Sequence, residues 1–182
     1  KFYAKCDAVA KTVFWLADRY RRMPDVIGLA EVENRGVLTR MLSSTLMRKY
    51  DYGIVHRESG DRRGIDVALL YRKSVMDTLS TSFVTPVYEG KLMQTRDILH
   101  ARMSLADSSV ADFIVNHHPS KFGGEEETRG RRDAAMETLK HFCDSLKGDQ
   151  MIVMGDFNDT PDAEQFRMLD GLLVNKAEGL HQ

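Results

Sequence analysis

The sequence predicts a mixed α/β domain in which helices flank a set of short, mostly antiparallel strands. Three observations predict it. Apolar residues at helical spacing open the chain, short apolar runs rich in branched side chains fill its middle, and a second stretch with helical spacing precedes a last apolar run. The 182 residues are 42% hydrophobic and 29% charged, an ordinary globular composition with enough chain for one core. No repeat, linker or composition step divides the sequence, so we expect a single domain over residues 1–182.

The N-terminal third predicts a helix, a strand and a second helix. Apolar residues between Phe2 and Tyr20 repeat at helical spacing, and Pro24 prevents that helix from continuing. Residues 25–30 form a short apolar run rich in branched side chains, which is typical of a buried strand. From Val37 the helical spacing returns, so we expect a second helix to about residue 50.

The middle of the chain predicts a strand meander with Gly- and Asp-bearing turns. Strands are expected at residues 52–56, 65–72, 82–88, 97–105 and 110–116. Their short connections favour antiparallel pairing, because a parallel pair needs a crossover of about a dozen residues or more. Asp66 lies on the opposite pleat face from its apolar neighbours, and we expect it to be exposed, with a supporting role behind the site residues as the alternative.

The C-terminal third predicts a loop, a helix, a strand and a short helix. A polar loop from Pro119 to about Thr128 precedes a helix that begins near Ala135 and stops at Gly148. We expect the charged run from Lys121 to Arg132 to be a mobile loop. Residues 151–154 predict another buried strand, and a short helix is expected around residues 163–169, started by Thr160 or Asp162 with Pro161.

Charge and cysteine content exclude several classes of protein. Lys and Arg total 26 against 27 Asp and Glu, so the formal charge is −1 and lacks the strong basic field of a general nucleic-acid coat protein. Cys6 and Cys143 lie outside any CxxC pattern, so we expect free buried thiols rather than a zinc site. No apolar run approaches the roughly 20 residues of a membrane span, so we expect a soluble chain. It starts at Lys1 rather than Met, which leaves a removed export signal open and the compartment unassigned.

Polar residues follow three of the predicted apolar strands: Glu31, Asn116 with His117, and Asp156 with Asn158. Strand ends can aim side chains from distant parts of a chain into one cleft. Carboxylates supply the oxygen ligands that Mg²⁺ prefers. The sequence therefore raises the hypothesis of a magnesium site.

Each cluster also has a structural interpretation. Glu31 can be a charge at a helix entry, residues 155–159 can be a simple turn, and Asn116 with His117 can be a solvated strand terminus. Adjacent strand residues point to opposite faces, so His117 and His118 are not expected to bind one ion together.

The order of the motifs resembles that of the endonuclease/exonuclease/phosphatase superfamily, which has the DNase I-like fold. Residues 24–33, PDVIGLAEVE, resemble its "PDI-x-x-LQE" segment, and residues 63–71, RGIDVALLY, resemble its "G-x-A-x-L-Y" strand. Residues 115–120, VNHHPS, are similar to its strand-end motif with Asn and His, and residues 153–159, VMGDFND, to its "GDFN" signature. The resemblance implies a four-layer sandwich of two mostly antiparallel β-sheets flanked by helices.

Two features of that superfamily are not visible in the sequence. Members usually begin with a strand that carries an Asn and end with an Asp-His pair on the last strand. His181 has no preceding Asp and does not match that pair. We therefore expect the chain to be a domain of this type that is incomplete at both ends.

The resemblance also implies roles for the strand-end residues. Glu31 would ligate Mg²⁺, with Mn²⁺ or Ca²⁺ as alternatives, and Asp156 would take a proton from the attacking water. Asn158 would orient that water or a phosphate oxygen. His117 would donate to the phosphoryl oxygens, with support from Asn116.

Arginines are a second group of candidates for phosphate contacts. Arg96 stands where several relatives place a basic residue on the substrate side, and its planar donors suit a phosphate. The alternative interpretation of Arg96 is a solvated residue that flanks the strand. Arg129, Arg131 and Arg132 are a further hypothesis for substrate contacts.

The function expected from the resemblance is a Mg²⁺-dependent phosphoesterase, a nuclease or a phosphatase. Its substrate would be a nucleic acid, an inositol phosphate or a lipid headgroup, and the near-neutral charge mildly favours a compact pocket over a long nucleic-acid groove. We expect a monomer. One alternative is an inactive module of the same fold that binds a phosphorylated ligand. Another, a Ca²⁺-binding turn at Asp156, Asn158 and Asp159, lacks the distal Glu of a helix-loop-helix calcium site.

Overall fold

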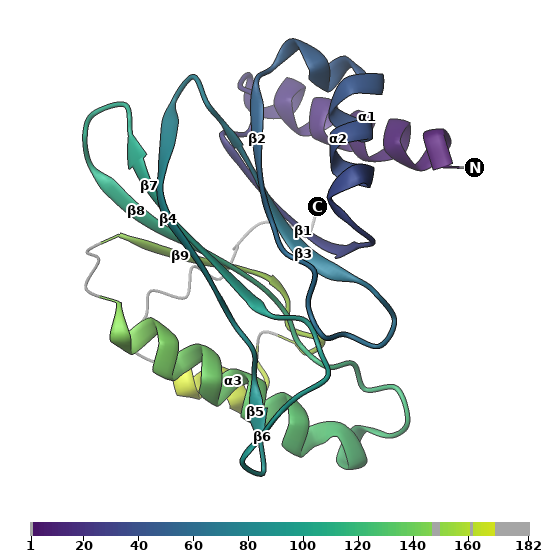
Figure 1. Ribbon diagram of the computed structural model, residues 1–182, viewed down its shortest axis with the longest axis vertical. Coiled ribbons are helices and arrows are strands. Elements are labelled where there is room, and N and C mark those ends of the chain that lie inside the picture. The colour runs from purple at the N-terminus through teal and green to yellow at the C-terminus, as the bar shows by residue number, and fades with distance from the viewer. Residues whose placement is uncertain (1, 147–149, 161, 170–182) are drawn as a thin grey trace.

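The computed structural model of this chain describes residues 2–146, 150–160 and 162–169. Two β-sheets pack face to face, with helices on both outer faces (Figure 1). The three-stranded sheet has the order β1 (Val26–Val32), β3 (Asp66–Arg72), β2 (Tyr52–His56). The four-stranded sheet has the order β4 (Met76–Val84), β7 (Ile98–Leu105), β8 (Val110–His117), β9 (Met151–Asp156). The predicted four-layer sandwich is confirmed.

Helices form the two outer layers (Figure 1). The three-stranded sheet is covered by α1 (Phe2–Tyr20) and α2 (Arg35–Ser44), and the four-stranded sheet by α3 (Glu125–Ser145) and the 3₁₀ helix η2 (Glu164–Leu169). Short elements complete the chain: the 3₁₀ helix η1 (Leu46–Lys49) and a small hairpin of β5 (Val87–Tyr88) and β6 (Lys91–Leu92). None of the helices in the described part of the chain combines the length and the apolar character that crossing a bilayer requires.

Three buried clusters hold the layers together. The first joins Cys6 and Leu38 of the N-terminal helices to Leu70 of β3, and the second fills the space between the two sheets. The third packs Leu139 and Cys143 of α3 against the four-stranded sheet. Both cysteines are free and buried, as the sequence predicts. Apolar surface is thus buried at every layer boundary, which is what stabilises a sandwich of this kind.

Among the described residues the strands pair antiparallel, as expected from their short connections, with one exception. β9 pairs with β8 in parallel, and α3 is the crossover between them. The register places Asn116 opposite Gly155, and His117 opposite Asp156. Parallel pairing therefore brings the polar ends of these two strands to the same edge of the sheet.

β1 lies against β8 and β9 of the other sheet. A side chain at Gly28 of β1 would place its Cβ 2.7 Å from Met154 Sδ and 3.5 Å from Val115 Cγ1. The glycine lets the two sheets approach closely here, so the end of β1 reaches the edge where β8 and β9 end.

Two predicted helix boundaries are wrong. The second helix does not run to residue 50, because Thr45 caps it: the Thr45 N–H donates to Met41 O, and Thr45 Oγ1 accepts from Met47 N to start η1. The later helix begins at Glu125, well before the expected Ala135, so much of the predicted loop is helical. Its first turn carries three glutamates, which favour a helix N-terminus electrostatically but give no apolar period to detect.

The predicted strand at residues 82–88 is also different in the structure. β4 begins at Met76, and a separate β5 follows it. Most of β4 is polar and exposed, so it lacks the alternation that identifies a half-buried strand. The predicted helix stop at Gly148, the start at Pro161 and the end of the chain at His181 lie outside the described residues.

Candidate active site

Asn116 lies at the end of β8 and is completely buried. Its Nδ2 donates to Met154 O of β9 at 2.9 Å, which ties the two strands together, whereas its Oδ1 has no hydrogen-bond partner in the described structure. Gly155 is required at the paired position: its φ is +138°, and a Cβ there would lie 1.9 Å from Asn116 O. This pair of residues closes the sheet tightly just before its polar edge.

His117 follows Asn116 and is buried. Its Nε2 lies 3.9 Å from Asp156 Oδ2, beyond hydrogen-bond length but suited to a shared oxygen between the two groups. Burial lowers the pKa of His117 below its usual 6.5, and the positive charge of Arg96 lowers it further, whereas Asp156 and Glu31 oppose the shift. A neutral imidazole is the result, with one N–H to donate.

Glu31 lies at the end of β1, where the pairing with β3 shifts register between Leu29 and Val32. Its φ of +58° is left-handed, a conformation that costs a residue other than glycine about 1–2 kcal/mol. The bulge leaves the Glu31 side chain exposed, and its charge acts on His117 together with that of Asp156. Glu31 and Asp156, which are far apart in the sequence, thus both act to raise the pKa of the same imidazole.

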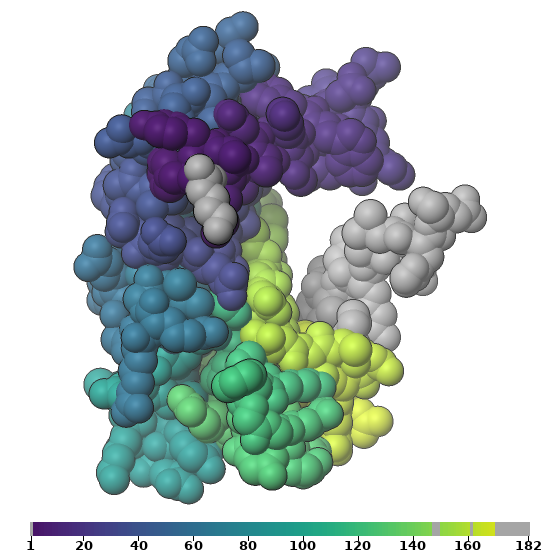
Figure 2. Space-filling view, turned by 90° about the vertical axis from the view of Figure 1, so that its right-hand side faces the viewer, coloured from purple at the N-terminus to yellow at the C-terminus, as the bar shows by residue number. Residues whose placement is uncertain are grey.

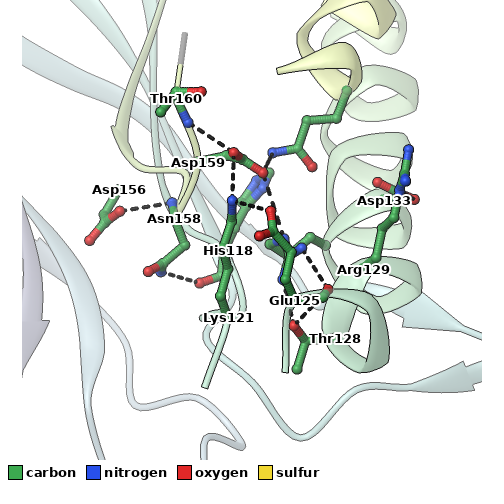
Figure 3. Close-up of polar contacts among 12 residues, drawn as sticks. His118, Lys121, Glu125, Thr128, Arg129, Asp133, Asp156, Asn158, Asp159 and Thr160 are labelled. Atoms are coloured by element: carbon green, nitrogen blue, oxygen red, sulfur yellow. Dashed lines mark hydrogen bonds and ion pairs between the residues drawn. The ribbon is translucent and has the colours of Figure 1, made fainter. Parts of the chain in front are cut away.

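Asp156 and Asn158 form a tight turn after β9. Asp156 Oδ1 accepts from the Asn158 N–H at 2.8 Å, while its side chain stays 56% exposed. Asn158 has a φ of +51°, which asparagine tolerates better than most residues. Its Nδ2 donates to His118 O at 2.8 Å, so the turn is fastened to the end of β8 (Figure 3).

Arg96 is buried beneath this edge. Its Nε donates to His117 O at 3.1 Å and its NH2 group to His118 O at 2.5 Å. Its NH1 group donates to Asp61 Oδ2 at 3.0 Å. The side chain is 4% exposed. This burial contradicts the solvated flank that was the alternative for Arg96, and the contacts give it a positioning role; a phosphate contact by Arg96 stays a prediction.

His118 belongs to the core of this region. Its ring packs edge-on against Phe157 with the ring centroids 5.0 Å apart, and neither ring nitrogen has a hydrogen-bond partner in the described structure. Burial lowers the pKa of His118 to about 3, with Arg96 and His117 adding to the shift. The side chain is therefore neutral over the whole physiological range.

A second set of polar contacts fixes the start of α3. Asp159 accepts from Lys121 Nζ at 3.0 Å and from the Thr160 N–H at 2.9 Å (Figure 3). Arg132 is buried and donates to Thr128 Oγ1 and Glu125 O. This is incompatible with a substrate contact by Arg132 in this conformation.

The other two arginines of that hypothesis differ from each other. Arg129 forms ion pairs with Asp133 and Glu164 on the protein surface. Arg131 is exposed and lines a cleft beside the strand ends. Of the three arginines, Arg131 has the exposure and the position at a cleft that a phosphate contact needs.

The oxygen donors of this edge fit a hard divalent ion in part. In the described portion of the chain no three His, Cys, Asp or Glu side chains converge as a ready metal cage. Mg²⁺ usually takes only one or two carboxylates and keeps its other positions for water and substrate. The exposed Glu31 carboxylate and the unpaired, buried Asn116 Oδ1 suit that arrangement.

Sequence reasoning missed one aspartate of this region, Asp61, and preferred the wrong alternative for another, Asp66. Asp61 pairs with Arg96, and although burial opposes it, hydrogen bonds from the Arg63 backbone and from Arg96 lower the pKa of Asp61. Asp66 is buried, contrary to expectation, because the loop before β3 folds back and Ser59 donates to it from both N and Oγ. Both aspartates stand in or near an ordinary polar turn, so no local signal distinguishes them.

Two face-to-face sheets with polar residues gathered at the ends of β1, β8 and β9 define a DNase I-like fold. The family model described as Endonuclease/Exonuclease/phosphatase family matches residues 1–177, and the chain belongs to that family. The resemblance seen in the sequence is thereby confirmed. The curated proteins include no significant match.

Solved structures share the fold at low sequence identity. The human Nocturnin catalytic domain with bound sulfate has a TM-score of 0.66 at 16% identity, covering 90% of this chain and 61% of its own. D. rerio TDP2 complexed with a single-strand DNA product has a TM-score of 0.63 at 17% identity, with coverages of 91% and 58%. The Bacteroides thetaiotaomicron mannosyl-6-phosphatase Bt3783 has a TM-score of 0.62 at 16% identity, with coverages of 93% and 62%. This chain thus spans about six-tenths of the length of these neighbours.

Proposed function

We propose that this protein is a divalent-metal-dependent phosphoesterase that hydrolyses a phosphate ester with an activated water. The pairing of the buried His117 with the exposed Asp156 at the ends of two parallel strands, with Nε2 3.9 Å from Oδ2, is the observation that carries the proposal. Membership of the Endonuclease/Exonuclease/phosphatase family supports it.

Each residue has a distinct part in the proposed reaction. Glu31 would hold the divalent ion, for which Mg²⁺ is the best match; a bound ion supplies Lewis-acid stabilisation of the phosphoryl oxygens. Asp156 takes the proton of the attacking water, because its carboxylate is exposed and is held in place by the Asn158 N–H. His117 donates an N–H to the negative charge that develops on the phosphoryl group.

Asn116, Asn158 and Arg96 act mainly by holding these groups. Asn116 and Asn158 anchor β9 and its turn to β8, and Arg96 clamps the two carbonyl groups at the end of β8. Preorganisation of this kind matters because small displacements of a catalytic group reduce the rate strongly. Asn158 also lies beside Asp156, where its amide can orient the attacking water.

The structural neighbours leave the ester class open. One neighbour, TDP2, is complexed with a single-strand DNA product, and another is described as a mannosyl-6-phosphatase. The candidate substrates therefore include phosphodiesters of nucleic acids as well as monoesters of sugars, inositol or lipid headgroups.

A substrate panel tests the proposal. We expect the full-length protein to release phosphate or cleave a diester from at least one of four probes when Mg²⁺ is present: plasmid DNA, bis-p-nitrophenyl phosphate, inositol phosphates and a hexose 6-phosphate. EDTA should abolish the activity, and excess Mg²⁺ should restore it. Tight binding of a phosphorylated probe without hydrolysis of any would favour the inactive binding module instead, and activity that is insensitive to EDTA would refute the metal dependence.

A further inference from the structure

A cleft of about 220 Å³ lies beside the end of β8, apart from Glu31, His117 and Asp156. Three segments that are distant in the sequence form it: residues 61–63 before β3, residues 94–96 before β7, and the stretch from Pro119 into α3. A neighbouring hollow shares three of its lining residues, Arg62, Gln94 and Arg131. In Figure 2, teal residues around 90 and green residues around 120 adjoin on the lower part of the face shown.

The cleft is strongly cationic. Arg62, Arg63 and Arg131 are exposed along its walls. The carboxylate that lines it, Asp61, is already paired with Arg96. Arg63 also pairs with Asp61 at 3.6 Å, and Arg62 Nε donates to Gln94 Oε1, whereas within the described residues neither Arg62 nor Arg131 forms an ion pair with a carboxylate. Guanidinium groups without carboxylate partners favour a ligand that carries negative charge, and their planar donors match a phosphate.

Thr95 is a second and independent sign of a ligand. It lines the cleft, is 2% exposed, and its buried Oγ1 has no hydrogen-bond partner in the described structure. A buried hydroxyl without a partner is unfavourable by itself. A phosphate oxygen in the cleft would supply the missing acceptor.

Arg96 and Pro119 connect the cleft to the proposed catalytic centre. Arg96 lines the cleft and donates from Nε to His117 O at 3.1 Å, and Pro119, two residues after His117, lines it as well. The cleft and the imidazole are therefore close enough to contact different parts of one substrate. Phe122 lies at the same cleft with 93% of its surface exposed, and such a ring can stack on a nucleobase.

We propose that this cleft is a second phosphate subsite, so that the substrate is a nucleotide or a short single strand with at least one phosphate besides the one hydrolysed. The proposal rests on the phosphoesterase function proposed above. Arg62 and Arg131 hold the second phosphate, Thr95 donates to it from below, and Phe122 contacts the adjacent base.

Binding without catalysis tests the subsite directly. The full-length protein in EDTA is titrated with fluorescently labelled trithymidylate, and the anisotropy gives the dissociation constant. Arg62→Ala and Arg131→Ala should each weaken binding about tenfold, and each should lower the slope of log affinity against log salt by about 0.7. Thr95→Val, which keeps the side-chain shape, should weaken binding severalfold and leave thermal unfolding unchanged or improved.

Arg40→Ala is the matched control, because Arg40 is an exposed arginine on α2 whose contact is Tyr3 Oη. It should bind the probe as the unaltered protein does. Unlabelled competitors identify the source of the second phosphate. Competition by a nucleoside 3′,5′-bisphosphate supports a small nucleotide, competition by the oligonucleotide alone supports a single strand, and a nucleoside monophosphate should compete at least tenfold more weakly than either.

Three results would overturn the subsite. The first is unchanged affinity for the probe in both arginine variants, and the second is equally strong competition by nucleoside monophosphates and bisphosphates. The third is weaker binding in the arginine variants but unchanged binding in Thr95→Val. The last would indicate surface charge without a built site. Failure of the proposed function looks different, because hydrolysis of every probe would be absent while these binding differences persist.

Discussion

His117 of β8 and Asp156 of β9 occupy paired positions on two parallel strands, with Nε2 of the first 3.9 Å from Oδ2 of the second. The strand register, rather than a direct hydrogen bond, keeps the two groups at this separation. A water or a phosphoryl oxygen can therefore enter between them without breaking an existing bond.

Asp156→Asn is expected to reduce hydrolysis by a factor of about 10²–10⁴, the usual contribution of a positioned general base. The fold should be unaffected, since the new amide oxygen can still accept from the Asn158 N–H. Steady-state kinetics and thermal unfolding measure the two effects. The control is Asp107→Asn, which alters a remote turn in which Asp107 Oδ1 accepts from Ser109 N at 3.0 Å in the same way. Equal activity of the two variants would rule out Asp156 as the base.

Arg96→Gln is expected to raise the pKa of His117. Burial would still lower the pKa of His117, but the positive charge of Arg96, which lowers it further, would be gone. Asp156 and Glu31 would still raise this pKa, and Arg63 would still lower it. An NMR titration of the His117 ring measures the shift. Arg102→Gln removes an arginine of β7 that pairs with Asp112, and should leave the His117 titration in place. A purely structural Arg96 would lower stability without moving this pKa.

Gly155→Ala is expected to destabilise the protein by about 3 kcal/mol, because its Cβ would overlap Asn116 O in addition to adopting a left-handed φ. Gly90→Ala is the matched comparison. Gly90 also has a positive φ, +73°, but nothing lies within 4 Å of its Cβ position, so the conformational penalty of about 1 kcal/mol stands alone. Chemical denaturation of both variants gives the difference. Similar losses would mean that β8 and β9 are not as closely paired at this point as described.

Acid should destabilise the protein through His118. Its pKa is about 3 in the fold, below its usual 6.5, so the unfolded chain binds more protons between these values. The stability contributed by the neutral ring is complete above pH 6.5 and falls with decreasing pH towards 3, by about 1.4 kcal/mol per pH unit. His118→Leu, which keeps an apolar contact with Phe157, should flatten this dependence when unfolding is measured between pH 7 and 4. An unchanged slope would show that His118 is already accessible to protons.

The helices and strands that the sequence predicts best are those with a periodic apolar pattern. α1 and β2 occupy the ranges expected for them, since Cys6, Ala10 and Val13 of α1 form a buried face. α3 and β4 differ from expectation where charged or polar residues dominate their exposed surfaces. A pattern can be detected only where one face is buried, which explains both results.

The candidate site was predictable in part for a similar reason. Glu31, His117 and Asp156 follow apolar strands, and strand ends are recognisable from the sequence. The functions of Arg96 and Asp61 were not, because their hydrogen bonds join segments 35 residues apart and leave no mark on the local pattern.

By itself the sequence determined which residue types stand at the strand ends, the alternation of helices and strands, and the family to which the chain belongs. Only the tertiary structure decided which of these residues meet, and which arginines are buried as supports or left exposed in a cleft. The physical reason is that burial and charge pairing are properties of segments brought together by packing. Local propensity acts over a few residues, whereas the site is built from three segments that the two sheets and α3 hold in place.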